Sequence, residues 1–287
     1  MNSISALLKT AEKENKPLYE IIAELDAHEN GTNRNQLNAQ MSALWLAMQE
    51  SSRQYSANDR SNSGLSGGDG EKIAKAKNRL LGGEYILRVT EEALKVAECN
   101  ACMKRIVAAP TAGSCGVLPA VLIPLKEERN VGDEVILHAL CIAAGFGEVT
   151  AARASVSGAE GGCQAEIGTA SAMAAAALTH VLGGNDVQCT HAFAIALSNL
   201  LGLVCDPVAG LVEIPCIRRN VIGAMNAVSA ANMAVAGIES RIPADEVIDA
   251  MGEVGASMSP ALRETGLGGL AATPTAKKLA KEIHGGR

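Results

Sequence analysis

The sequence predicts a mainly α-helical protein that folds as a single compact domain, with buried central helices rich in Ala and Gly. Two features of the composition support this fold class. Of the 287 residues, 48% are hydrophobic and only 2% are aromatic, whereas 49 are Ala and 29 are Gly. Small side chains let helices pack closely, and a sheet would be richer in aromatic and β-branched residues. The composition therefore disfavours an all-β sandwich.

The hydropathy and the charge exclude other classes of protein. A mean hydropathy of +0.13 with 20% charged residues is not that of a disordered chain. The 25 basic and 31 acidic residues give a net charge of −6, which offers no electrostatic footprint for nucleic acid. The densest basic segment, residues 72–79, is typical of a solvated helix face. We therefore expect no nucleic-acid partner.

An N-terminal helical layer is predicted over about residues 1–50, where apolar residues recur at helical spacing, as in Leu7, Leu8 and Ala11. Charged residues between positions 9 and 16 interrupt the apolar run that a signal peptide would need. We therefore expect no export and a cytoplasmic location.

A flexible loop is predicted over about residues 51–70, because Ser, Asn, Asp and Gly dominate this segment. It ends in Gly-Leu-Ser-Gly-Gly-Asp-Gly at residues 64–70, and a linker and an active-site loop are both compatible with that run. Glu71 follows, so the Gly-Lys-Ser/Thr ending of a phosphate loop is missing. The core of the domain is then expected over about residues 71–287.

Helical patterning at residue 73 and over about 85–106 stops at Pro-Thr-Ala-Gly-Ser-Cys-Gly, residues 110–116. An apolar run from residue 117 predicts a helix start there. Thr111 and Ser114 are natural N-cap residues, and a glycine-containing turn before a helix N-terminus can bind anions. Thr111, Gly113 and Ser114 are therefore candidates for holding a substrate carboxylate, with simple helix capping as the alternative.

Residues 167–185 and 187–205 carry no formal charge and have membrane-spanning length. Ala, Gly, Ser, Thr, His and Asn dilute both stretches, and no Lys/Arg asymmetry flanks them. They predict buried central helices rather than membrane spans. Further helices are expected over about 220–239 and 243–251, before a Gly-, Ala- and Thr-rich tail from residue 266.

The eight cysteines favour burial or metal ligation over disulfides in a reducing compartment. Cys102, Cys141 and Cys189 lie within or beside apolar helical patterns, where a free Cys usually packs as a small hydrophobe, and we group Cys115 with them. Cys99 and Cys102 form a C-x-x-C, but neither a second pair nor a βαβ context accompanies it. We therefore do not predict a zinc or redox site there.

The other three cysteines stand at breaks in the chain. Cys163 follows two glycines and opens a helical segment, Cys205 precedes Asp-Pro, and Cys216 follows a proline. Backbone amides at such breaks can hydrogen-bond inorganic sulfide, and a helix N-terminus favours a thiolate. Three thiolates leave one position of an iron-sulfur or zinc site open, and an open iron can act as a Lewis acid. From spacing alone, an incidental set of three loop cysteines remains the alternative.

Three motifs carry a resemblance to a known family: Ser-Gly-Ala-Glu-Gly-Gly-Cys-Gln-Ala-Glu at 157–166, Cys-Asp-Pro-Val at 205–208 and Ile-Pro-Cys at 214–216. They resemble the α chain of bacterial iron-sulfur-dependent L-serine dehydratase. The similarity extends end to end and includes residues 64–68, 110–114 and 266–274. It implies that Cys163, Cys205 and Cys216 hold a 4Fe-4S cluster with one open iron. It also implies deamination of L-serine to pyruvate and ammonia without pyridoxal phosphate.

The remaining site residues are assigned with alternatives. His191 is a candidate base or hydrogen-bond donor near the ligands, and a core histidine is the alternative. Ser155 and Ser157 precede the first ligand and are expected to line the same pocket. Arg218 and Arg219 are expected either to neutralise cluster or substrate charge or to cap the helix nearby.

Some members of the family are one long polypeptide with a β-type domain and a C-terminal cysteine. This chain ends at Arg287 and has no cysteine after Cys216, so it resembles the α chain of the two-chain form. A separate β chain is then expected as partner and as a source of a catalytic base. An L-cysteine desulfidase is the alternative enzyme. A non-enzymatic redox sensor is disfavoured, because neither a DNA-binding element nor a basic face is evident.

Overall fold

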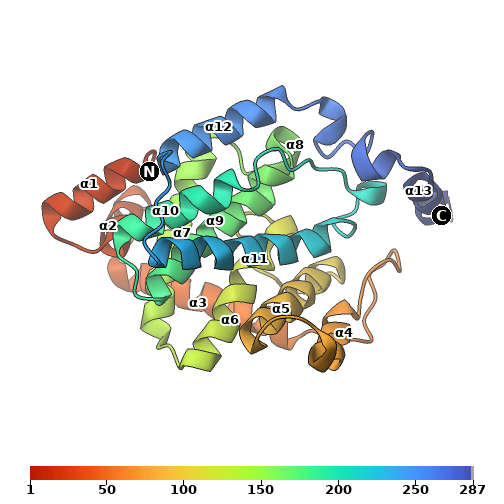
Figure 1. Ribbon diagram of the computed structural model, residues 1–287, viewed down its shortest axis with the longest axis horizontal. Coiled ribbons are helices and arrows are strands. Elements are labelled where there is room, and N and C mark those ends of the chain that lie inside the picture. Colours follow the sequence, from red (N-terminus) through yellow and green to blue (C-terminus); the bar gives the residue numbers. More distant parts are fainter. Residues whose placement is uncertain (286–287) are drawn as a thin grey trace.

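The structure, a computed structural model, describes residues 1–285 and has thirteen α-helices and no β-strand within that range (Figure 1). The predicted mainly α single domain is confirmed. In chain order the helices are α1 Ile4–Glu14, α2 Leu18–Glu29, α3 Arg34–Arg53, α4 Asp69–Ala76, α5 Glu84–Ala101, α6 Val117–Arg129, α7 Asp133–Arg153, α8 Gly158–Gly161, α9 Thr169–Val181, α10 Asp186–Ser198, α11 Cys216–Val235, α12 Ala244–Ser257 and α13 Pro274–Gly285.

Helix α9 forms the centre of the core, where α6, α7, α10 and α11 pack around it (Figure 1). Six of its 13 residues are alanines, and those at positions 174–177 have no exposed surface. A helix that is buried on all sides needs no polar face. The prediction of buried central helices over residues 167–185 and 187–205 is therefore confirmed by α9 and α10.

Glycines at the helix crossings allow this close packing. A Cβ atom added to Gly145 of α7 would lie 2.7 Å from Cγ2 of Ile22 in α2. One added to Gly223 of α11 would lie 3.0 Å from Cγ2 of Ile167, and the Ser171 hydroxyl donates to the Gly223 carbonyl at 2.7 Å. Because Gly145 and Gly223 carry no side chain, the side chains of neighbouring helices pack directly against the backbone at these crossings.

Helix α7 was not singled out by the sequence patterns. Within residues 1–285 it is the one helix with the length and apolarity to cross a membrane, and 61% of its apolar window is buried inside the protein. It packs against α2, α3 and α9. Its apolar character is therefore accounted for by these contacts in the core.

The N-terminal helices α1, α2 and α3 cover one side of this core (Figure 1). Asn33 and Gln36 form a capping box at the start of α3. Asp245 of α12 accepts hydrogen bonds from the backbone amides of Ile4 and Ser5, so it caps α1 from across the fold. This contact joins the first helix, α1, to α12.

The connection between α3 and α4 spans residues 54–68 and docks on the segment before Cys216. The buried Glu213 carboxylate accepts hydrogen bonds from Ser61 at 2.7 Å and from Ser63 at 2.8 Å. Ser61 and Ser63 belong to the Ser-rich composition that predicted a loop here, and they attach this loop to the segment before Cys216.

The helices near the C-terminus differ from the expected ones. Helix α11 begins at Cys216 rather than near residue 220, and α12 continues to Ser257 rather than ending near 251. The tail contains α13, which the composition did not predict. Ala276 is the only buried residue of α13 in the described range, although Leu279, Ala280 and Ile283 follow it at helical spacing.

Candidate active site around three cysteines

Cys163, Cys205 and Cys216 come from three separate segments and meet as buried side chains, 2%, 2% and 8% exposed. Cys163 precedes a π-helical turn over Gln164–Gly168 that leads into α9. Cys205 lies in the connection between α10 and α11, and Cys216 is the first residue of α11. The cysteines that sequence analysis grouped are therefore neighbours.

The three thiols influence one another directly. A hydrogen bond from the Cys205 thiol, together with the Arg219 guanidinium, holds the pKa of Cys163 below its usual value against the effect of burial. The same hydrogen bond and burial raise the pKa of Cys205 far above normal. Burial and then the neighbouring Cys163 raise the pKa of Cys216 to about 12. Cys163 is thus the thiol of this group that ionises first.

Backbone contacts fix the cysteine segments against one another. The Gln164 amide donates to the Leu203 carbonyl at 2.9 Å, and the Cys205 amide donates to the Leu262 carbonyl at 2.8 Å. Gly162 has a φ of +76°, and a Cβ atom there would lie 3.0 Å from the Leu203 carbonyl oxygen. The close approach before Cys163 therefore requires glycine.

A buried ion pair links the Cys205 segment to α11. Nη2 of Arg219 lies 2.8 Å from Oδ1 of Asp206, and Nη1 donates to the Val204 carbonyl at 2.7 Å. Of the two arginines considered from sequence, Arg219 is buried and near Cys163, whereas Arg218 is exposed.

Asn220 connects the turn at residues 110–116 to the same helix. Its Nδ2 donates to the carbonyls of Gly113 at 2.8 Å and Cys216 at 3.0 Å, and its Oδ1 accepts from the Gly116 amide at 2.8 Å. The proposed anion-binding turn therefore lies beside the Cys216 end of the site.

Two of the three candidate residues in this turn face the site. The Thr111 hydroxyl donates to Oε1 of Glu166 at 2.8 Å, and a Cβ atom on Gly113 would lie 3.3 Å from the same oxygen. Ser114 is fully buried and its hydroxyl contacts the carbonyls of Ala109 and Thr111 at 3.3 Å. Ser114 thus stabilises the turn itself, in line with the capping alternative.

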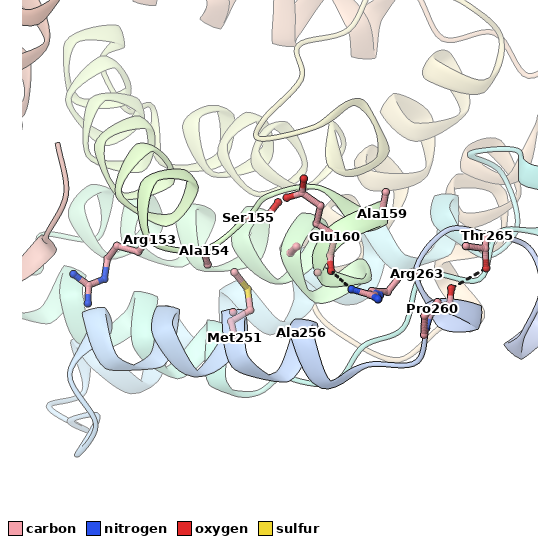
Figure 2. Close-up of a pocket in the computed structure, with 13 residues that line it drawn as sticks. Arg153, Ala154, Ser155, Ala159, Glu160, Met251, Ala256, Pro260, Arg263 and Thr265 are labelled. Carbon is pink, nitrogen blue, oxygen red and sulfur yellow. Dashed lines mark hydrogen bonds between the residues drawn. The ribbon is translucent and has the colours of Figure 1, made fainter.

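Ser155 lines a cavity of about 560 Å³ between the end of α7, α8, α12 and residues 260–265, shown in Figure 2. Gly161 and Ala165, which flank Cys163, form part of its wall. Ser157 precedes α8, and its amide donates to the Ser155 hydroxyl at 3.1 Å. Ser155 therefore lines this cavity together with residues on either side of Cys163, whereas Ser157 contacts Ser155 and is not among the lining residues.

His191 lies on α10, and its Nδ1 accepts a hydrogen bond from the Ser240 amide at 3.2 Å. Within residues 1–285 no hydrogen bond or ion pair joins His191 to the three cysteines. The observed contact fits the packing alternative, and the role of His191 as a base stays a prediction.

The other cysteines pack within the fold. Cys99 donates to the Ser51 carbonyl at 3.2 Å, Cys141 donates to the Tyr19 carbonyl at 3.3 Å, and Cys189 has no exposed surface. All eight cysteines are free thiols. No group of three or more His, Cys, Asp or Glu side chains in the described part of the chain converges on a point where it would hold a single metal ion.

A family model described as serine dehydratase alpha chain matches residues 12–271. The chain belongs to this family. It is 54% identical over 228 residues to the probable L-serine dehydratase, alpha chain, of Bacillus subtilis, covering 79% of this chain and 76% of that relative. The L-serine dehydratase, alpha chain, of Peptoniphilus asaccharolyticus is 39% identical over 286 residues, 99% of this chain and 98% of that relative. L-serine dehydratase TdcG of Escherichia coli is 49% identical over 181 residues, 62% of this chain and 40% of that longer relative.

In this member of the serine dehydratase alpha chain family, sequence reasoning gave no role to Glu166, Asp206 or Asn220. Glu166 had one visible signal, since it is the last charge before the uncharged stretch 167–185. Its carboxylate is reached by the Thr111 hydroxyl, and burial raises its pKa above the usual value. Asp206 and Asn220 gave no such signal, because their partners lie in other segments.

Proposed function

We propose that this chain is the catalytic α chain of an L-serine dehydratase, which converts L-serine to pyruvate and ammonia. One observation carries the proposal: three cysteines from distant segments meet as buried thiols beside the Thr111 turn and the Glu166 carboxylate. The names of the Bacillus and Peptoniphilus relatives support the choice of substrate.

We infer that Cys163, Cys205 and Cys216 hold a 4Fe-4S cluster. Thiolates of such a cluster bind different irons, so they need not converge on one point, and three of them leave one iron without a protein ligand. The set consists of sulfur donors alone, and the Arg219 guanidinium beside Cys163 offsets negative charge. These residues therefore fit a cluster better than a single ion.

When bound, the cluster supplies a Lewis acid for the carboxylate and hydroxyl of the substrate. The protein supplies the surroundings. The N-terminus of α6 follows the turn with Thr111 and Gly113, and its positive dipole end favours the substrate carboxylate. Burial of the three cysteines keeps bulk water from the reacting atoms.

The reaction removes the α-proton and the β-hydroxyl of serine as water. The aminoacrylate product then tautomerises to an imine, and hydrolysis of that imine yields pyruvate and ammonia. His191 accepts a hydrogen bond from Ser240, and within residues 1–285 no hydrogen bond or ion pair joins it to the three cysteines. We therefore propose that a separate β chain completes the enzyme and provides the base, in the cytoplasm, where cysteines stay reduced.

The test uses the α chain purified anaerobically with its β chain. We expect iron and acid-labile sulfide, and pyruvate from L-serine. Cys163→Ala, Cys205→Ala and Cys216→Ala should each lose most of the iron and the activity, because each removes one thiolate. Cys189→Ala, at a buried packing position, is the matched control and should retain both.

Two results would contradict the proposal. Full iron and sulfide content in all three cysteine variants would show that the ligands are wrong. Sulfide released from L-cysteine, with no pyruvate formed from L-serine, would identify a desulfidase instead.

A further inference from the structure

The Glu166 carboxylate beside the three cysteines has no cationic partner. Its Oε1 accepts the Thr111 hydroxyl at 2.8 Å, and no Lys, Arg or His in the described chain forms an ion pair with it. Burial raises the pKa of Glu166, the Thr111 hydrogen bond opposes this, and the negative charge of Glu264 adds to the rise. Asp206, the other acid of the site, is neutralised by Arg219.

Two glycines pack closely against this carboxylate. A Cβ atom added to Gly158 would lie 2.7 Å from Oε2 of Glu166 and 3.1 Å from Sγ of Cys205. One added to Gly113 would lie 3.3 Å from Oε1. Oε2 of Glu166 and Sγ of Cys205 therefore both lie close to Gly158, which places the carboxylate beside this cysteine.

Oε2 also has capacity to accept a ligand. A carboxylate offers about four lone-pair sites, and within residues 1–285 the Thr111 hydroxyl is the one donor to Glu166. Glu166 is only partly buried as a residue, whereas the three cysteines are buried. Glu166 also lies in the π-helical turn Gln164–Gly168, and such turns occur frequently at functional sites.

A serine dehydratase must accommodate an α-ammonium group, and placing that cation away from water without a partner is costly. We propose that Glu166 binds the α-ammonium group of L-serine and thereby makes the site selective for 2-amino acids over 2-hydroxy acids. The inference rests on the proposed function. An ammonium donating to Oε2 forms a charge-assisted hydrogen bond and gives the isolated carboxylate its counter-charge.

The test is Glu166→Gln in the complete two-chain enzyme, since Gln keeps the shape and an oxygen for the Thr111 hydrogen bond but carries no charge. A hydrogen bond to a charged group is worth about 1.5–3 kcal/mol, so KM for L-serine should rise about 10- to 150-fold. The inhibition constant of L-glycerate, which has a hydroxyl in place of the ammonium, should stay near its wild-type value.

A second readout does not depend on turnover. L-Alanine and L-lactate cannot lose a β-hydroxyl and differ only in the ammonium or hydroxyl group, so their binding can be measured by calorimetry on the anaerobic holoenzyme. The wild type should prefer L-alanine, and Glu166→Gln should lose that preference. Glu246→Gln removes an exposed charge in the first turn of α12, outside the cavity lining, and should keep the preference for L-alanine.

Iron content and circular dichroism check that Glu166→Gln is folded and loaded. If it is not, Glu166→Asp, which withdraws the charge by one methylene, should lower the preference for L-alanine while leaving L-lactate binding unchanged. The inference would be overturned if folded Glu166→Gln kept the wild-type preference for L-alanine over L-lactate. It would also be overturned if Glu166→Gln lost kcat but bound L-alanine as tightly as the wild type. A wild-type enzyme that neither consumes nor binds L-serine would instead overturn the proposed function.

Discussion

The guanidinium of Arg219 lies 2.8 Å from the carboxylate of Asp206, and the two side chains are only 10% and 4% exposed. Arg219 also donates to the Val204 carbonyl, and Asp206 accepts from the Leu270 amide at 2.7 Å. This pair therefore joins three parts of the chain: the Cys205 segment, α11 with Cys216, and residues 269–272 before α13.

Breaking this pair on one side should destabilise the protein strongly. Arg219→Leu leaves the Asp206 carboxylate buried without a counter-charge, and such a change costs about 3–5 kcal/mol. The double variant with Asp206→Leu removes both charges and should lose less stability than Arg219→Leu alone. Urea unfolding of the purified protein, followed by circular dichroism, measures both.

The more exposed Arg153–Asp249 pair provides the control, with side chains 27% and 46% exposed. Arg153→Leu should change the free energy of unfolding by no more than about 1 kcal/mol. If Arg219→Leu and Arg153→Leu lost the same amount of unfolding free energy, burial of the Arg219–Asp206 pair would have no energetic consequence.

Gly158→Ala should impair the site through steric conflict. The added methyl group would lie 2.7 Å from Oε2 of Glu166 and 3.1 Å from Sγ of Cys205. Overpacking of this kind costs about 1–3 kcal/mol of folding free energy, and relieving it displaces Glu166 or Cys205, so kcat/KM for L-serine and iron content should both fall. Gly83→Ala, which has no heavy atom within 4 Å of its new Cβ, is the control for a neutral substitution. Wild-type kcat/KM and iron content in Gly158→Ala would refute this expectation.

The sequence predicted the elements whose pattern is local. The uncharged, alanine-rich stretches identified α9 and α10, because a helix surrounded by other helices lacks a polar face. Cys163, Cys205 and Cys216 were grouped because each stands next to a glycine or proline break. The structure places Cys163 and Cys216 at the starts of helical segments and Cys205 in the connection between α10 and α11.

The contacts between segments could not be predicted in the same way. The helix expected to begin near residue 220 begins at Cys216, so Arg219 and Asn220 lie within its first turns. They are polar because they face Asp206 and the Gly113 turn, which depends on how distant segments pack. Glu166 was missed for the same reason, since its partner Thr111 lies in another segment.

A histidine cluster lies away from the cysteine site. The rings of Tyr19 and His138 stack with centroids 3.7 Å apart, and His180 packs edge-on to both. Burial lowers the pKa of His138 and of His180 from the ordinary value of 6.5, although Glu134 and Asp186, respectively, oppose the shift.

These lowered pKa values predict an acid-sensitive component of stability. As the pH falls through about 6.5, the unfolded chain binds protons at these positions before the folded chain does. The stabilisation is therefore complete above that pH and declines as the pH falls toward the lowered folded pKa.

His180→Gln, which cannot titrate, should lose less unfolding free energy between pH 7 and pH 5 than the wild type, as measured by urea unfolding at each pH. His28→Gln, an exposed position at the end of α2, should match the wild-type pH dependence. Identical pH dependence in wild type and His180→Gln would show that protonation of this buried ring does not oppose folding.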